Sequence, residues 1–175
     1  MTELISAQVR QPWFALYVKP RHEKHVSCVL RGKGYEEFVP LYSRRTRSRS
    51  CDLPLFPGYV FCRFPPHNRL PILSVPGVFY IVAAGGQPAP LEDEEIEALR
   101  KLVCSGLPRG PWPYIAEGEK VVLQDGPLRG VSGHVLRLKN AGRLIVSVSV
   151  LQRSVAIEID NSWVAPNRYR PWHVT

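Results

Sequence analysis

The stretch Pro54-Leu55-Phe56-Pro57-Gly58-Tyr59-Val60-Phe61-Cys62-Arg63-Phe64 is rich in aromatic and β-branched residues, which are typical of strands. Side chains alternate between the two faces of a strand. Tyr59 and Phe61 therefore share one face, with Arg63 if the strand continues that far, and Val60, Cys62 and Phe64 share the other. Because both faces are largely apolar, we expect an internal strand of a sheet.

The segments on either side of this stretch predict a mixture of strands and helices. We expect strands at 13–18, 38–40 and 78–82, and helices at 21–33, 68–74 and 91–104. Gly34 stands where a left-handed residue would end the first of these helices. The acidic run Glu92–Glu95 lies at the positive end of the last helix, which favours a role in complementing the helix dipole over a metal site.

The segment 43–52 has a different composition. It contains four arginines, Arg44, Arg45, Arg47 and Arg49, and no large apolar side chain. A segment of this kind has little to contribute to a core, so we expect a mobile loop.

The second half of the chain begins with a proline-rich segment. Residues 108–114 contain three prolines, which lack a backbone donor. We therefore predict a linker there, between a domain at 1–107 and a domain at 115–175. Strand patterns follow at 120–123, 131–138, 144–150 and 154–159, and the third alternates strictly, with Leu144, Val146, Val148 and Val150 on one face. A small all-β barrel of about five strands fits, since closure removes exposed edges.

The composition limits the class of protein. The chain carries 23 Lys and Arg against 15 Asp and Glu, a net charge of +8, which favours nucleic acid or ribonucleoprotein partners, with mere solubility as the alternative. The four cysteines form no C-x-x-C pair, so we expect a reduced, cytosolic protein without a zinc site. No apolar run approaches the roughly 20 residues that span a bilayer, and 1–12 lacks the apolar core of a signal peptide.

Enzymatic motifs are not found in the sequence. The run His22-Glu23-Lys24-His25 is one residue short of the H-E-x-x-H zinc helix. The glycines form no phosphate loop, and there is no nucleophile elbow. We expect a protein that is not an enzyme and that needs no cofactor and no metal.

Two ordered sets of motifs lie on either side of the proline-rich segment. Pro54–Phe61 contains Phe-Pro-Gly-Tyr, and Trp13-Phe14, Ser74–Val78 and Pro88–Leu91 accompany it. The second set comprises Glu117–Val121, Asp125–Leu128, Gly130, Gly133 and Val146–Val150. Together they resemble the NusG/RfaH family of transcription elongation and antitermination factors over 13–164. The resemblance implies an α+β fold class, with an N-terminal antiparallel sheet flanked by helices (the NGN domain) and then a KOW β-barrel.

The resemblance also implies a function and a polymerase-binding surface. Family members bind the clamp helices of RNA polymerase and suppress pausing, and rigid aromatic residues suit such a contact. The aromatic positions map to Phe56, Tyr59 and Phe61, although Phe56 and Phe61 are alternatively core residues. Further residues that extend the patch are Leu41, Tyr42, Phe79 and Tyr80.

A basic cluster marks a second candidate site. It is formed by Lys19, Arg21, His22, Lys24 and His25 at the start of the first helix. In the RfaH branch this junction contacts non-template DNA. Lys19, His22 and His25 align with the contacting positions, and only Lys19 has the same residue type as that branch. A solvated helix face is the alternative. The arginines of 44–49 are expected to attract DNA or nascent RNA without reading its sequence.

The KOW domain carries a third candidate site. Leu151-Gln152-Arg153 stands where housekeeping NusG proteins usually show Phe-Gly-Arg at their contact with Rho and a ribosomal protein. The loss of an aromatic anchor favours a specialised antitermination paralogue. We also expect the protein to be a monomer. A housekeeping NusG and a ribosome-associated KOW protein remain alternatives, and the Phe-Pro-Gly-Tyr motif weighs against the latter.

Overall fold

The computed structural model describes residues 11–45, 50–112, 119–137 and 142–164 of the 175-residue chain. The chain divides into two compact units, Met1–Ile96 and Glu97–Thr175. Helix α3 spans Asp93–Cys104 at the junction of the two units, and the domain bounds 1–107 and 115–175 stay a prediction.

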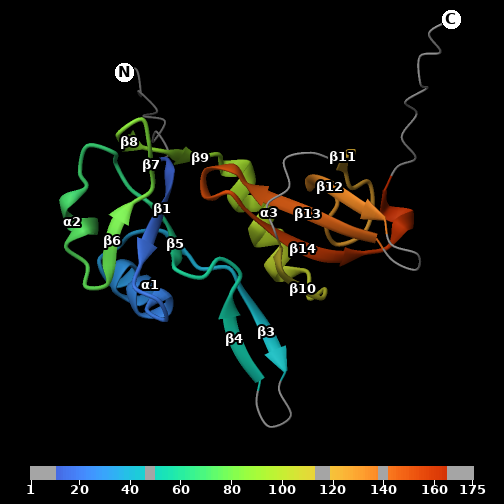
Figure 1. The fold of residues 1–175 in the computed structure, drawn as a ribbon, viewed down its shortest axis with the longest axis horizontal. Coiled ribbons are helices and arrows are strands. Elements are labelled where there is room, and N and C mark those ends of the chain that lie inside the picture. Colours follow the sequence, from blue (N-terminus) through green and yellow to red (C-terminus); the bar gives the residue numbers. More distant parts are fainter. Residues whose placement is uncertain (1–10, 46–49, 113–118, 138–141, 165–175) are drawn as a thin grey trace, which may run out of the picture. The chain divides into compact units, whose positions relative to one another are not determined.

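The first unit is built around strand β1 (Trp13–Val18), which occupies the middle of an antiparallel sheet (Figure 1). β1 pairs with β5 (Tyr59–Arg63), β6 (Val78–Ile81) and β9 (Pro90–Leu91), and β2 (Glu37–Phe38) pairs with the far side of β5. The internal position of β5 is thus confirmed. It begins at Tyr59 because Pro57 and Gly58, with φ +84°, form a turn before it. β7 (Ala83–Ala84) and β8 (Gln87–Pro88) form a separate small ribbon.

Two helices of this unit follow the expected pattern with shorter bounds. α1 spans Glu23–Gly32 and α2 spans Leu70–Leu73. α1 starts two residues later than the sequence suggested, because Arg21 has a left-handed φ of 66° that a helix cannot include. Gly34, with φ +85°, confirms the predicted left-handed ending, and the Tyr35 N–H donates to the Leu30 carbonyl across it at 3.1 Å.

The core of the first unit lies between α1 and one face of the sheet. Phe14, Leu16 and Val18 of β1 share it with alternate residues of β5, as the alternation predicted. The Phe14 and Phe64 rings lie 4.6 Å apart between centroids. Burial raises the pKa of the Cys62 thiol to about 12, so this thiol stays protonated and unreactive.

The segment predicted as a mobile loop contributes instead to a hairpin. β3 (Leu41–Arg45) pairs with β4 (Ser50–Pro54) from Leu41 opposite Pro54 to Arg45 opposite Ser50 (Figure 1). The Ser43 hydroxyl donates to the Asp52 carboxylate at 2.6 Å across the pair. Backbone pairing does not require apolar side chains, which is why composition alone predicted a loop. The residues between the strands, 46–49, lie outside the described part of the chain.

The second unit contains a five-stranded antiparallel sheet in the order β10-β14-β13-β12-β11. These strands span Arg109–Trp112 (β10), Glu119–Val122 (β11), Ser132–Arg137 (β12), Gly142–Val148 (β13) and Arg153–Ile159 (β14), with short helices η1 (Ser149–Leu151) and η2 (Asn161–Trp163). Across the described residues no pairing joins β10 to β11, so the structure shows an open sheet and not the closed barrel that we expected.

Two details of this sheet differ from the sequence-based expectation. Residues 109–112, predicted as part of a linker, form β10, because proline is tolerated on an edge strand that leaves one side unpaired. In β13 the residues Leu144, Val146 and Val148 are buried as predicted, but Val150 lies beyond the strand in η1.

Gly133 has no room for a side chain, since a Cβ there would lie 2.5 Å from the Ile145 carbonyl oxygen.

Candidate functional site

Four aromatic side chains gather at the end of the first unit's sheet where β1 leads toward α1. The Tyr17 ring lies at the centre of the group, with ring centroids 4.9 Å from Tyr80, 5.4 Å from Tyr59 and 5.9 Å from Phe79. Phe79 and Tyr80 are 58% and 51% exposed, and Tyr17 and Tyr59 are half-buried. We call Tyr17, Tyr59, Phe79 and Tyr80 the aromatic surface.

A β-bulge brings two consecutive residues of β6 to this surface. Tyr17 pairs with Tyr80 and Val18 pairs with Val78, so Phe79 is the extra residue in β6. A bulge interrupts the alternation of side chains and can turn an additional one to the same face. This explains how Phe79 and Tyr80 can both approach Tyr17, although a regular strand would point them in opposite directions.

The structure separates the five aromatic residues predicted to bind polymerase into two groups. Tyr59, Phe79 and Tyr80 belong to the aromatic surface. Phe56 and Phe61 are fully buried and pack against each other at 5.7 Å between centroids, and neither belongs to the cluster that α1 covers. They are buried packing residues, which is the alternative that the sequence left open. Tyr17 was not predicted, although it follows Trp13 and Ala15 at alternate positions on the same face of β1.

The basic cluster lies directly after β1. Lys19, Arg21, Lys24 and His25 are exposed, and His22 is half-buried with its ring 6.1 Å from that of His25 between centroids. The Lys19 N–H donates to the Gly77 carbonyl at 2.8 Å, which ties the start of the cluster to the turn before β6. The structure therefore brings this cluster and the aromatic surface to the same end of the sheet.

The arginine hairpin, defined as β3 and β4 with the residues between them, is described in part. Arg44 is exposed opposite Cys51, and the backbone of Arg45 pairs with Ser50. Arg47 and Arg49 lie outside the described residues. An apolar groove of about 520 Å³ runs beside the base of the hairpin, lined among others by Tyr17, Tyr42 and Leu53, with Arg21 and Lys24 at the same groove.

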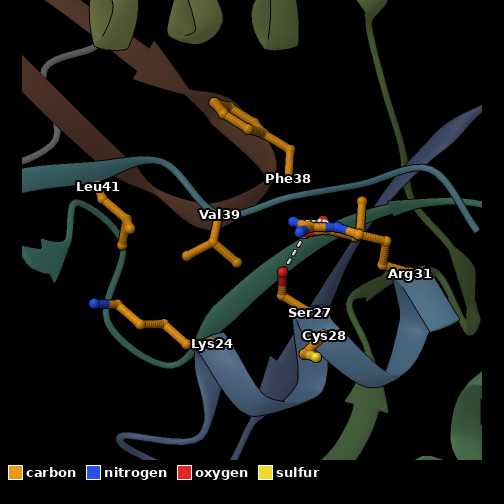
Figure 2. A pocket seen from close by; sticks show the side chains of 8 residues that line it. Lys24, Ser27, Cys28, Arg31, Phe38, Val39 and Leu41 are labelled. Atoms are coloured by element: carbon orange, nitrogen blue, oxygen red, sulfur yellow. Dashed lines mark hydrogen bonds and ion pairs between the residues drawn. The ribbon is translucent and has the colours of Figure 1, made fainter.

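A smaller hollow of about 290 Å³ lies between α1 and the segment that leads from β2 into β3 (Figure 2). Ser27 and Arg31 both donate to the carboxylate of Glu37, the Arg31 Nε at 2.9 Å. These polar groups satisfy one another, so the hollow offers an external ligand little beyond the Lys24 amine and the Cys28 thiol. We assign no function to it.

The tip between β13 and β14 differs from a typical exposed contact site. Leu151 is only 7% exposed, whereas Gln152 and Arg153 are exposed. Gln152 has a φ of 50°, a left-handed conformation that glycine adopts readily and glutamine does not. The tip therefore presents two polar side chains and no aromatic ring.

No group of three or more His, Cys, Asp or Glu side chains within the described ranges is placed to hold a metal ion. None of the helices in that part of the chain is long and apolar enough to cross a membrane.

Comparison with known proteins decides the family. Residues 11–100 match the family model described as transcription termination factor NusG. NusG of Escherichia coli, a transcription termination/antitermination protein, is 32% identical over 134 residues, which cover 74% of this chain and 73% of the relative. The chain belongs to the NusG family. Such proteins are transcription factors, not enzymes.

Other NusG proteins show the same relationship. NusG of Buchnera aphidicola is 32% identical over 129 residues, which cover 71% of each chain. A solved structure of Thermotoga maritima NusG superposes with a TM-score of 0.56 at 21% identity and covers 89% of this chain and 96% of that one. This likeness confirms a NusG-like fold.

One prediction concerns the tip, where the NusG pattern has glycine in place of Gln152. Changing Gln152→Gly is expected to raise the free energy of unfolding by about 0.5–1 kcal/mol, because glycine relieves the strained φ of 50°. Thermal and urea unfolding of the full chain measure the change. The exposed neighbour serves as the control, since Arg153→Gly should leave stability unchanged or lower it. Equal destabilisation by both changes would contradict the prediction.

Proposed function

We propose that this NusG-family protein binds RNA polymerase through the aromatic surface and suppresses pausing and termination. The observation that carries the proposal is the group of three aromatic rings around Tyr17, of which Phe79 and Tyr80 are exposed. Exposed aromatic residues cost free energy to leave in water, and rigid rings with a polar edge are the commonest anchors in protein interfaces. The polymerase clamp helices, which the family resemblance implies as partner, offer the helical surface that such anchors fit.

Nucleic acid is the second partner that we propose. The basic cluster places exposed cations beside the aromatic surface, and Arg44 places one on the hairpin. A protein held on polymerase by the aromatic rings would then present these cations to DNA or nascent RNA in the elongation complex. Contacts of this kind attract phosphates and do not read sequence.

The second unit is proposed to act as a KOW domain that recruits a further partner. Its five-stranded sheet and its motif glycines support this role, and Rho or a ribosomal protein are the partners that the resemblance implies. The polar tip at Gln152 and Arg153 favours a specialised antitermination factor over a housekeeping NusG.

The polymerase proposal is tested by Tyr59→Ala in a binding assay with core RNA polymerase. We expect about tenfold weaker binding, because an anchor ring is lost from a half-buried position without opening a deep cavity. Tyr59→Phe keeps the ring and should retain most of the affinity. If the folded Tyr59→Ala chain binds as tightly as the parent chain, Tyr59 is not part of the interface.

The nucleic-acid proposal is tested by changing Arg44, Arg45, Arg47 and Arg49 to serine. Binding to an elongation complex should weaken, and the slope of log affinity against log salt should fall by up to about four units, because fewer counterions are released. A matched control removes the same charge from Lys33, Lys101, Arg129 and Arg153, which are exposed outside the hairpin. If both variants change the slope equally, the hairpin contributes only net charge.

A further inference from the structure

We propose that Glu23 is a positioning residue that holds the aromatic surface in its binding conformation. The inference rests on the proposed polymerase-binding function and assigns a role to a buried side chain that acts through the turn at Gly58. Glu23 lies in the first turn of α1, 35 residues before the turn that it holds in place.

The contact itself is a buried hydrogen bond between distant segments. Glu23 is only 5% exposed, and its Oε1 accepts a hydrogen bond from the Gly58 backbone N–H at 2.8 Å. Charged side chains are rarely buried unless they are paired or hydrogen-bonded, and an ionised acceptor makes a stronger bond to an N–H than a neutral acceptor. The carboxylate also lies at the positive end of the helix dipole, which favours its charge.

Gly58 connects the Glu23 carboxylate to two rings of the aromatic surface. The next residue along the chain is Tyr59, and a Cβ added to Gly58 would lie 3.2 Å from the Tyr17 ring. The Gly58 carbonyl accepts from the Val18 N–H at 2.8 Å, directly after Tyr17. The turn is thus held by the carboxylate through its N–H and by β1 through its carbonyl.

The other flanking strand is held at the same place. The Lys19 N–H donates to the Gly77 carbonyl at 2.8 Å, and Gly77 precedes the strand that carries Phe79 and Tyr80. The end of β1 therefore holds the Pro57-Gly58 turn and the Pro76-Gly77 turn through backbone hydrogen bonds. Glu23 supplies the side-chain hydrogen bond that is described for the Gly58 amide. Without it, the N–H of Gly58 would be buried without an acceptor and the turn would be free to shift.

The experiment measures binding of full-length variants to core RNA polymerase, together with their thermal stability. Glu23→Ala should bind about tenfold more weakly while folded, because the turn under Tyr59 is released. Glu23→Gln should remain within about twofold of the parent, since its amide oxygen can still accept the bond. Val29→Ala, in the same helix but away from Gly58, controls for lost stability and should bind like the parent once folded.

Three outcomes separate this inference from the proposed function. Parental binding by Glu23→Ala with weak binding by Tyr59→Ala overturns the role of Glu23 and leaves the aromatic surface standing. Parental binding by both variants removes the proposed function. Equal weakening by Glu23→Ala and Val29→Ala reduces Glu23 to a stability role and also overturns the inference.

Hydrogen exchange at the Gly58 amide tests the bond directly, without a binding assay and without the alanine variant. This amide should be protected from exchange in the parent chain and in Glu23→Gln. It should lose that protection in any folded variant that lacks an acceptor at position 23. If the Gly58 amide of the parent exchanges as fast as an exposed turn amide, the bond is absent in solution and the inference fails, even if Glu23→Ala cannot be folded.

Discussion

A chain with both Phe79→Ala and Tyr80→Ala is expected to bind core RNA polymerase about 100-fold more weakly than the parent chain, or worse. The two rings are the most exposed members of the aromatic surface, at 58% and 51%. Their truncation opens no cavity in the core, so the first unit should stay folded. Each ring also packs against Tyr17, so removing both leaves that ring without its neighbours on β6.

Two controls keep this result interpretable. Val122→Ala truncates another exposed apolar side chain, 46% exposed in the second unit, and should not change polymerase affinity. Leu70→Ala removes an exposed leucine of α2 and tests whether any exposed apolar side chain of the first unit contributes. Parental affinity of the Phe79→Ala, Tyr80→Ala chain in a folded state would move the interface away from the aromatic surface.

The sequence predicted most of the first unit because its signals are local. Alternation identified the two faces of β5, and Gly34 marked the end of α1 through the conformation that it adopts. The sequence did not reveal the bulge at Phe79, because a bulge depends on the register with β1 and not on the residues of β6 alone. Tyr17, the central ring of the aromatic surface, was missed for a different reason, because its neighbours on the same face of β1, Trp13 and Ala15, are buried.

Pairing between segments explains the other differences. The flanks of the arginine run pair as β3 and β4, and residues 109–112 pair with β14, although neither segment has the apolar pattern of a strand. Proline excluded an interior strand correctly, but it did not exclude an edge. Closure of the second sheet is likewise a property of its two edges, β10 and β11, about which alternation within each strand says nothing.

The burial of Leu151 at the tip between β13 and β14 differs from the position that the sequence predicted for it. Leu151 was predicted to stand in place of an exposed aromatic anchor, but it is nearly buried, and the exposed residues are Gln152 and Arg153. The absence of an anchor ring is therefore a property of the whole tip. Phenylalanine at position 151 alone would have to fit a buried site beside a strained Gln152, which risks overpacking.

We expect this protein to lengthen transcripts without promoting Rho-dependent termination. In a purified transcription assay it should increase read-through past pause sites, because we propose that the aromatic surface holds polymerase. It should add little to release by Rho, because the tip lacks an aromatic anchor. An anchor of this kind commonly contributes more than about 1 kcal/mol to an interface. Because Leu151 is buried, a ring at this position reaches a partner only if the backbone of the tip adjusts, and glycine at position 152 allows that adjustment. The double variant Leu151→Phe, Gln152→Gly should therefore recover part of the Rho or ribosomal-protein binding, and Leu151→Phe alone should not. If the parent chain instead shifts Rho termination upstream as strongly as a housekeeping NusG does, the polar tip is a tolerated variation and the housekeeping alternative is correct.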